Sequence, residues 1–492
     1  MINTMNKKAA SSATLLVLCS MMTGCMNLAP NYERPAAPIA SVYSLPDYYK
    51  QVLNIDDESL GLKSDQKPLQ TFSDERLQKL ITIALENNRD LRTAALNVTK
   101  ARAQYGIQDA QTLPTIDAAG GVSASRVPAD FSATRQERIN REHSVSLGTT
   151  AYELDFFGRV QNLKAQALEE MYGTEEAKQT VQLSLITEVA NSWVTWAEDQ
   201  DLLAVAESLL DSQTETLSLI HKRYDLGDAT ALELRQQEIA VATARSEAER
   251  LIGQNAQDRN ALTLLLGTQV PEALIPTGFG QAVMTNDGTD VITAIPVGLP
   301  SDLMLRRPDI LESEHRLKAA NANIGVARAA FYPSISLTAT GGLRSVSLND
   351  LFDSTAKAWS FAPQISLPIF DGGANQANLD IAQADRDIAV ANYEKTIQTA
   401  FREVSDALAL RASITNRLDA QRALIVASEQ AFSLTKARYE HGVDSWLDVL
   451  DAERVYTDAH TGLITLYGEQ QTNSLTLFKV LGGGWDDKTA EL

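Results

Sequence analysis

The stretch Arg438-Tyr-Glu-His-Gly442 repeats a pattern that first occurs as Arg223-Tyr-Asp-Leu-Gly227, 215 residues earlier. Each copy closes a long tract without proline, over about 159–223 and about 374–438. At 1.5 Å per residue, a helix over either tract is about 100 Å long. A glycine at the end of such a helix favours a tight reversal, so a helix of about 37 residues is expected to return from each turn.

Further anchors recur in the same order along the chain, with one small change of offset. They are Arg89-Asp90 with Pro308-Asp309, Pro114 with Pro333, and Leu266-Gly267 with Leu481-Gly482. We interpret the chain as an internal tandem repeat of about 215 residues, which is far longer than the repeat of a solenoid. This repeat predicts two structural halves, residues 73–267 and 302–484, joined by a Gly- and Pro-rich connecting segment over 268–301.

Within each half the same elements are expected in the same order. A helix over about 74–112, or 302–332, ends near a proline. Two segments follow in which apolar and small or polar residues alternate, as in strands with one apolar face. They lie at 116–124 and 143–156 in the first half, and at 335–339 and 359–367 in the second. The predicted fold class is α+β, with four strands per chain.

Composition and charge exclude several kinds of function. The 492 residues include 63 acidic and 43 basic side chains, giving a net charge of −20, so a nucleic acid is not an expected partner. The sequence has no Gly-rich phosphate loop and no Gly-x-Ser-x-Gly motif, and its five histidines are scattered without a metal-binding spacing. We therefore expect neither an enzyme nor a bound cofactor.

The N-terminus has the pattern of an export signal. Lys7 and Lys8 precede a short apolar run over 13–19, and Thr23-Gly24-Cys25 resembles the cleavage box of bacterial lipoproteins. This pattern predicts a signal peptide over 1–24 and a covalent lipid on Cys25, while a plain signal peptide with an incidental cysteine is the alternative. Residue 26 is Met rather than Asp, which in lipoproteins favours the outer membrane. An extended segment over 25–72 and a tail over 485–492 complete the domain organisation.

Four strands of about ten residues cannot close a barrel by themselves, and unpaired strand edges are not tolerated in lipid. If the strands enter the outer membrane, the chain must therefore oligomerise, with eight strands in a dimer or twelve in a trimer. The alternative from periodicity alone is a small sheet that caps a non-channel periplasmic coiled-coil scaffold.

Five motifs carry a resemblance to a known family. They are Leu28-Ala-Pro-Asn-Tyr-Glu-Arg-Pro35, the run from Pro296 to Asp309 (Pro-Val-Gly-Leu-Pro-Ser-Asp-Leu-Met-Leu-Arg-Arg-Pro-Asp), Ala319-Ala-Asn-Ala-Asn-Ile-Gly325, Phe331-Tyr-Pro-Ser-Ile-Ser336, and the run from Arg438 to Ala452. In these motifs the chain resembles the outer-membrane factors of tripartite efflux pumps, and it is closer to the lipidated OprM-like branch than to TolC. The similarity covers essentially the whole chain after Cys25.

This resemblance implies an architecture and a function. It implies a homotrimer whose twelve-stranded transmembrane β-barrel continues into a twelve-helix periplasmic α-barrel, located in the outer membrane. It implies a passive exit duct for drugs and other small molecules, coupled through a periplasmic adaptor to an inner-membrane pump of the resistance-nodulation-division (RND) type. Export of polypeptides in a type I secretion system is the alternative within the channel class.

The resemblance also implies a gate at the periplasmic tip. Asp448, Asp451 and Arg454 recur at three-residue spacing on one helix face, and the family places its constriction at positions matching these residues and Leu447. In a trimer the two carboxylates become a ring of six, which attracts cations and is a candidate divalent-cation site. Solvated surface charges are the alternative interpretation.

Two further sets of residues follow from the family pattern. Tyr439 and Glu233 match positions that form a latch between neighbouring helix pairs, whereas Asp444 replaces the Arg seen in TolC, so a second TolC-type latch is not expected. The turns match the tips at which the adaptor docks. The docking residues implied are Arg223, Gly227, Arg438, Gly442 and Ser445.

Overall fold

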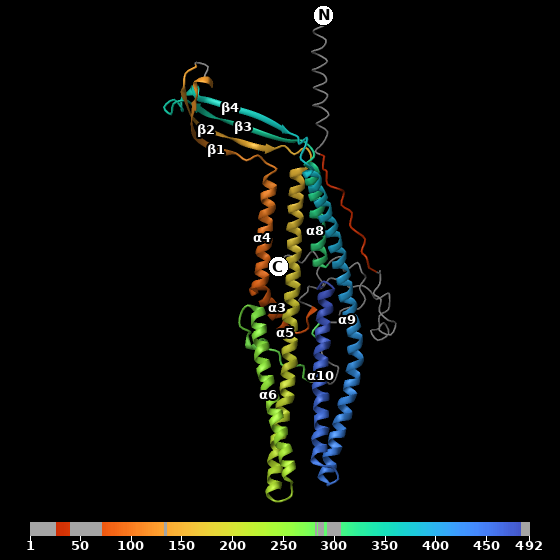
Figure 1. Cartoon of the computed structure of the whole chain (residues 1–492). Coiled ribbons are helices and arrows are strands. Elements are labelled where there is room, and N and C mark those ends of the chain that lie inside the picture. Colours follow the sequence, from red (N-terminus) through yellow and green to blue (C-terminus); the bar gives the residue numbers. More distant parts are fainter. Residues whose placement is uncertain are drawn as a thin grey trace. The chain divides into compact units, whose positions relative to one another are not determined.

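The computed structural model describes residues 26–39, 71–131, 135–280, 283, 290–292 and 307–483 (Figure 1). The predicted signal peptide, Cys25 and the tail over 485–492 lie outside these residues. By their internal contacts the residues fall into two compact units. Unit 1 lies within Met1–Ala36, Val98–Thr174 and Glu312–Tyr393, and unit 2 within Ala37–Asn97, Glu175–Leu311 and Glu394–Leu492. Each unit therefore draws on both of the predicted sequence halves.

Unit 1 contains a four-stranded antiparallel sheet in the order β1-β2-β3-β4. The strands are β1 (Asp117–Val127), β2 (Arg138–Glu153), β3 (Ser334–Ser345) and β4 (Lys357–Ser366). All four predicted strands are present, and each of them extends beyond one or both ends of the alternating segment from which it was predicted. Among the described residues the outer edges of β1 and β4 have no partner strand.

The sheet has one apolar and one polar face. Val145 pairs with Leu343 and Gly341 with Trp359, and residues directly opposite each other in a ladder share a face. The neighbouring positions on the other face carry Glu142 and Arg344, which form an ion pair. The apolar face is open in the single chain: Trp359 is 82% exposed and Ile365, farther along the same strand, 68%.

The helix expected over about 74–112 is interrupted at one residue. Helix α3 (Glu75–Asn87) ends and helix α4 (Arg89–Ala110) begins on either side of Asn88. The Asn88 backbone is extended, and its side-chain Oδ1 accepts hydrogen bonds from the backbone N–H groups of Asp90 and Leu91 at 2.9 Å. The prediction of one continuous helix is wrong because this asparagine caps the second helix.

The long helices agree with the prediction. Helices α5 (Arg159–Asp225) and α9 (Ala374–Glu440) have 67 residues each, and their two ends differ by the same 215 positions. The returning helices are α6 (Ala231–Leu266) and α10 (Trp446–Val480), so that α5–α6 and α9–α10 form two helical hairpins (Figure 1). Helix α8 (Pro308–Ala329) is shorter than expected and starts with proline at its first position. Among the described residues, no helix combines the length and the apolar character needed to cross a membrane.

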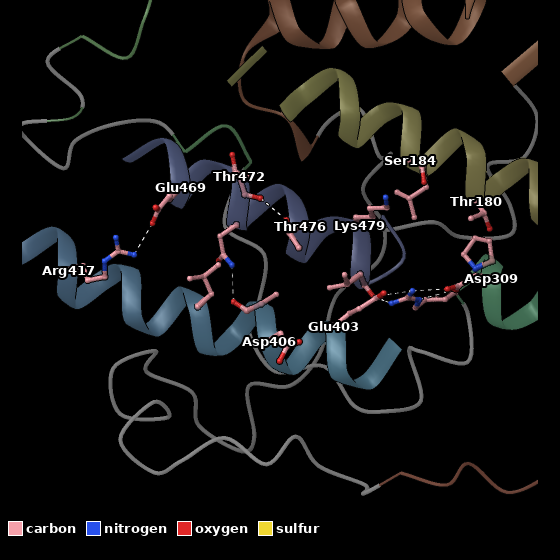
Figure 2. Close-up of a pocket in the computed structure, with 17 residues that line it drawn as sticks. Thr180, Ser184, Asp309, Glu403, Asp406, Arg417, Glu469, Thr472, Thr476 and Lys479 are labelled. Carbon is pink, nitrogen blue, oxygen red and sulfur yellow. Dashed lines mark hydrogen bonds and ion pairs between the residues drawn. The ribbon is translucent and has the colours of Figure 1, made fainter. Parts of the chain in front are cut away.

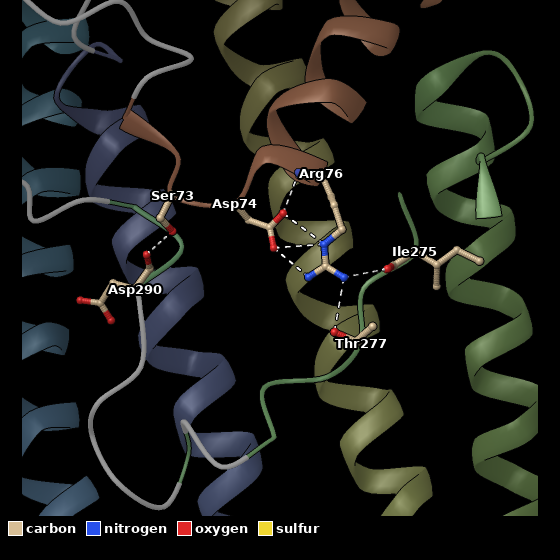
Figure 3. A network of polar contacts seen from close by, with 6 residues as sticks. All are labelled: Ser73, Asp74, Arg76, Ile275, Thr277 and Asp290. Atoms are coloured by element: carbon tan, nitrogen blue, oxygen red, sulfur yellow. Dashed lines mark hydrogen bonds and ion pairs between the residues drawn. The ribbon is translucent and has the colours of Figure 1, made fainter. Parts of the chain in front are cut away.

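The core of unit 2 joins α3 to the hairpins. Leu77 and Leu80 of α3 are fully buried in one cluster with Trp193 of α5, Leu262 of α6 and Phe478 of α10. Polar contacts hold the start of α3 against the connecting segment (Figure 3). Asp74 caps α3 and binds the Arg76 guanidinium, which also donates to the Ile275 carbonyl and the Thr277 hydroxyl. The Ser73 hydroxyl donates to the Asp290 carbonyl at 2.6 Å.

In unit 1, the described part of the N-terminal segment is held against α8. The Glu314 carboxylate, whose side chain is only 4% exposed, accepts hydrogen bonds from Tyr32 and, through both oxygens, from Arg34. Further along α8, the Asn321 side-chain amide donates a hydrogen bond to the Pro30 carbonyl. Over residues 26–36 this segment contains neither helix nor strand.

Candidate gate at the turns of the two helical hairpins

The two turns that carry the predicted gate have the same backbone. Gly227 and Gly442 adopt φ values of +83° and +72°, which only glycine enters without strain. The N–H of each glycine donates to the backbone carbonyl three residues earlier, that of Tyr224 or Tyr439. The following N–H donates to the carbonyl of the arginine that opens each motif, at 2.8 and 2.9 Å. These paired bonds are those of a Schellman helix end.

Both returning helices start with a capping box. The Thr230 hydroxyl accepts from the Glu233 N–H, and the Glu233 carboxylate accepts from the Thr230 N–H at 2.7 Å. Ser445 and Asp448 repeat the arrangement at the second turn, where the Asp448 carboxylate accepts from the Ser445 N–H at 2.9 Å and from its hydroxyl at 2.6 Å. These bonds lower the pKa of the Asp448 carboxyl, so it is ionised at neutral pH.

The two arginines that open the motifs differ in their partners. Arg438 forms a two-pronged ion pair with Asp444 of its own turn, at 2.7 and 2.8 Å, which lowers the pKa of the Asp444 carboxyl. Arg223 instead reaches the other hairpin, donating to the Tyr439 hydroxyl at 2.7 Å and lying over its ring at 5.7 Å. Arg223 and Tyr439 therefore form a polar contact between the two hairpin turns.

The predicted latch is arranged differently from the expectation. The Glu233 carboxylate closes its own capping box, and among the described residues no hydrogen bond joins it to Tyr439. Glu233 nevertheless acts electrostatically on Arg223, the group that binds Tyr439. The signal for its capping role was present in the sequence as Thr230-x-x-Glu233.

The four predicted constriction residues lie together at the start of α10 and are exposed. Asp451 forms an ion pair with Arg454 at 2.8 Å, and Arg454 also reaches Asp458 at 3.3 Å. Leu447 is 57% exposed. Within one chain the carboxylates are thus partnered, and no group of three or more His, Cys, Asp or Glu side chains among the described residues is arranged to hold a metal ion.

A buried polar network between α5, α6 and α10, close to the hairpin turns, was not predicted. Gln237 of α6 has no exposed surface, and Gln213 of α5 and Trp446 of α10 are also buried. Gln237 accepts from the Trp446 indole N–H at 3.2 Å and donates to the Gln213 carbonyl and side-chain oxygen at 2.7 and 2.6 Å. Gln213 donates in turn to Glu453 at 2.7 Å. Nothing in the spacing of two glutamines distinguishes this network from ordinary surface positions.

Unit 2 also holds a cavity of about 850 Å³, bordered by α5, α8, α9 and α10 (Figure 2). Its charged side chains pair with one another. Arg307, which is buried, binds Asp309, Glu403 and the Val480 carbonyl, while Arg417 binds Glu469. These bonds tie the start of α8 to α9 and the end of α10, so the polar groups have a structural role.

Comparison with known proteins identifies the family. The family model described as outer membrane efflux protein matches residues 80–268 and 299–483, which is most of the chain. The chain belongs to the outer membrane efflux protein family. The predicted family is thereby confirmed, together with the predictions of an outer-membrane location and an efflux function.

Individual members of this family are similar over nearly their whole length. The toluene efflux pump outer membrane protein TtgC and the antibiotic efflux pump outer membrane protein ArpC, both from Pseudomonas putida, are each 44% identical to the chain. Both alignments cover 98% of the chain and 97% of the relative. These relatives are efflux proteins, so the alternative of a non-channel scaffold finds no support among them.

A solved structure gives the same result for the fold. The open state of the MtrE outer membrane channel of Neisseria gonorrhoeae matches with a TM-score of 0.78 and 34% identity. The match covers 93% of the chain and 98% of that structure. Mixed helical and sheet content, the coarser part of the predicted fold class, is confirmed.

Proposed function

We propose that this chain forms, as a homotrimer, the outer-membrane exit duct of a tripartite efflux pump for organic small molecules. The observation that carries the proposal is the sheet of unit 1, which has one apolar face, one polar face and two unpaired edges among the described residues. A four-stranded sheet of this kind is incomplete in lipid, because its edge N–H and C=O groups need partners.

In a trimer, the sheets of three chains can pair at their edges and close into one barrel. A closed barrel of twelve strands places the apolar face, with Trp359 and Ile365, toward lipid and the polar face, with Glu142 and Arg344, toward the lumen. The four strands have 10–16 residues, enough to cross the hydrocarbon layer when tilted. A dimer would supply eight strands, whose interior is filled by side chains rather than open.

In the proposed channel, the hairpin turns form the gate and the surface at which the adaptor docks. In a trimer, Asp448 and Asp451 of three chains form a ring of six carboxylates at the narrow end of the helical tunnel. Asp448 is ionised at neutral pH because its capping bonds lower its pKa, so the ring attracts cations, and a divalent cation held there reduces flow. The exposed turns around Gly227 and Gly442 are the surface offered to the adaptor.

The partners and cargo follow from the family. Relatives are named as outer membrane proteins of antibiotic and toluene efflux pumps, and we extend both kinds of cargo to this chain. An adaptor and an RND transporter complete the pump, and a lipid on Cys25 anchors the N-terminus to the outer membrane. Energy comes from the inner-membrane partner, since the sequence has no nucleotide-binding motif.

Deletion of the gene tests the proposed function in the bacterium that encodes it. The deletion strain should lose tolerance to toluene and to several antibiotics, and expression of the full chain should restore both. Its secreted proteins should be unchanged. Normal tolerance combined with loss of a secreted polypeptide would overturn the proposal in favour of type I secretion.

A further inference from the structure

The apolar face of the sheet carries three charged side chains, and all three are basic: Arg126, Arg141 and Lys357. The register assigns them to this face, because residues paired across a ladder share a face and alternate residues of a strand return to it. Lys357 is paired with Leu343, and Arg141 lies four residues before Val145 on β2. Arg126 comes two residues after the partner of Arg141 on β1. Within the four described strands, this face has no Asp or Glu.

The three basic residues lie at one end of the sheet. Arg126 is the last residue but one of β1, Arg141 the fourth of β2 and Lys357 the first of β4. These strand ends adjoin the loops between β1 and β2 and between β3 and β4, whereas the helices adjoin the opposite end (Figure 1). At the helix end the same face has Ile335 opposite Ile365. The face is therefore basic near the loops and uncharged near the helices.

The basic side chains are accessible to a ligand. Those of Arg141 and Lys357 are exposed and have no hydrogen bond or ion pair with the described residues. Arg126 forms an ion pair with Glu137 at 2.5 Å, in which the two side chains are 70% and 53% exposed. An ion pair as exposed as this contributes little stability, so a phosphate can take the place of the Glu137 carboxylate.

The N-terminal segment indicates which end of the sheet faces out of the cell. The Met26 N–H donates to the Phe156 carbonyl at 3.2 Å, just beyond the helix end of β2. A lipid on Cys25, the preceding residue, would therefore enter the membrane at the helix end. Lipoproteins of the outer membrane insert their lipid into the periplasmic leaflet, so the loop end belongs to the outer leaflet.

The chemistry of that leaflet matches the basic residues. A charged side chain facing lipid is costly at the middle of a bilayer and tolerated near its surface. The outer leaflet of a bacterial outer membrane consists largely of glycolipid whose lipid A head group carries phosphates. A guanidinium binds phosphate through paired charge-assisted hydrogen bonds, and an ammonium binds it as a point charge.

The basic residues also lie beside the edges that a trimer must join. The edge strands are β1 and β4, so β4 of one chain pairs with β1 of the next in the proposed barrel. Lys357 of one chain and Arg126 of the next then flank the loop end of the same junction, and Arg141 lies one strand further on.

We propose that Arg126, Arg141 and Lys357 bind the phosphate groups of lipid A in the outer leaflet, beside the junctions between protomers. This inference rests on the proposed trimeric barrel and adds to it a lipid partner and the residues that recognise it.

Titration of the purified full-length trimer with lipid A, followed by native mass spectrometry, tests the proposal. Arg141→Gln/Lys357→Gln should weaken the apparent affinity at least about tenfold, because two charged contacts to phosphate are lost. Arg138→Gln is the matched control. Arg138 is three residues before Arg141 on β2 and also exposed, but it lies on the polar face, so its loss should leave the affinity unchanged.

Competing lipids distinguish the glycolipid from other anions. Dephosphorylated lipid A should bind at least about tenfold more weakly than lipid A. Phosphatidylglycerol, an anionic phospholipid, should compete poorly. Equal affinities in the double variant and the unaltered trimer, or equal binding of any of these lipids, would overturn the proposal. If the unaltered protein formed no trimer, the proposed channel would fail instead, so the two failures are distinguishable.

A variant with the opposite expected effect separates binding from damage to the fold. Glu137→Gln releases Arg126 from its exposed ion pair and should tighten lipid A binding about two- to fivefold. A general loss of structure cannot tighten binding. Unchanged or weaker binding in Glu137→Gln would overturn the assignment of Arg126 to the lipid site.

Discussion

The two hairpin turns have the same backbone but different side-chain contacts, and one position accounts for much of the difference. Both turns have a glycine at positive φ and a capping box. At the second turn Asp444 captures Arg438, whereas the equivalent position of the first turn is Ala229, which leaves Arg223 available for Tyr439. The same backbone thus serves two purposes. In the second turn the arginine binds within its own turn, whereas in the first turn it binds the other hairpin.

The buried network of Gln213, Gln237, Trp446 and Glu453 should produce the largest difference between the hairpins. Gln237→Leu leaves the Trp446 indole N–H and the Gln213 side-chain oxygen buried without partners, at about 1–3 kcal/mol each. We expect a loss of about 3 kcal/mol in local stability, measured by amide hydrogen exchange in α6 and α10. Ser428→Ala, at a buried serine of the other hairpin, should cost less than about 1 kcal/mol. Similar losses in the two variants would show that the buried network stabilises its hairpins no more than the single buried serine does.

The second largest difference between the hairpins should be in how their stability depends on pH. Burial raises the pKa of Glu198 on α5 to about 7, and its carboxyl lies against α10, where a Cβ on Gly468 would be 2.1 Å from it. The equivalent residue of the other hairpin is Ser413. The folded state keeps the Glu198 proton up to about pH 7, whereas the unfolded chain releases it near 4.5, so stability falls as the pH rises between these values.

Glu198→Gln should remove that dependence. Between pH 5 and pH 8, we expect thermal unfolding of the trimer to show a loss of stability that is about 2 kcal/mol larger than in the variant, after allowance for the partial exposure of the carboxyl. The neighbouring Asp199 and Glu469 act in the same direction on Glu198 and are retained in both proteins. A pH dependence that survives the substitution would assign the effect to those groups.

The smallest effect should be the same in both turns. No atom lies within 4 Å of a Cβ placed on Gly227 or on Gly442, so alanine at either position is penalised only by the positive φ. Gly227→Ala and Gly442→Ala should each cost about 1 kcal/mol in the stability of the local turn, measured by hydrogen exchange. A clearly larger cost at one turn would show that the two backbones differ in solution.

The sequence predicts those features whose signals are local. Alternation with period two located the four strands, and the long proline-free tracts ended by Gly227 and Gly442 located the hairpins. The interruption at Asn88 was missed because a helical pattern continues on both sides, and only the side chain's capping bonds reveal it.

The contacts between hairpins could not be predicted in the same way. Gln213 and Gln237 lie on different helices, and their link to Trp446 and Glu453 requires the packing of α10 against both. Family similarity indicated that Tyr439 is a latch residue but not that its partner in this chain is Arg223, because the choice depends on whether position 444 or position 229 carries a carboxylate.

Single-channel conductance of the purified, inserted trimer tests the central claim most directly: that this chain is an efflux channel closed at its hairpin turns. The protein should be compared with Asp448→Ala/Asp451→Ala, and with Ser445→Ala as a control that weakens the same capping box without removing a carboxylate. We expect a small, cation-selective conductance that grows in the double variant and stays small in the control. No conductance from any of the three inserted trimers would contradict the account.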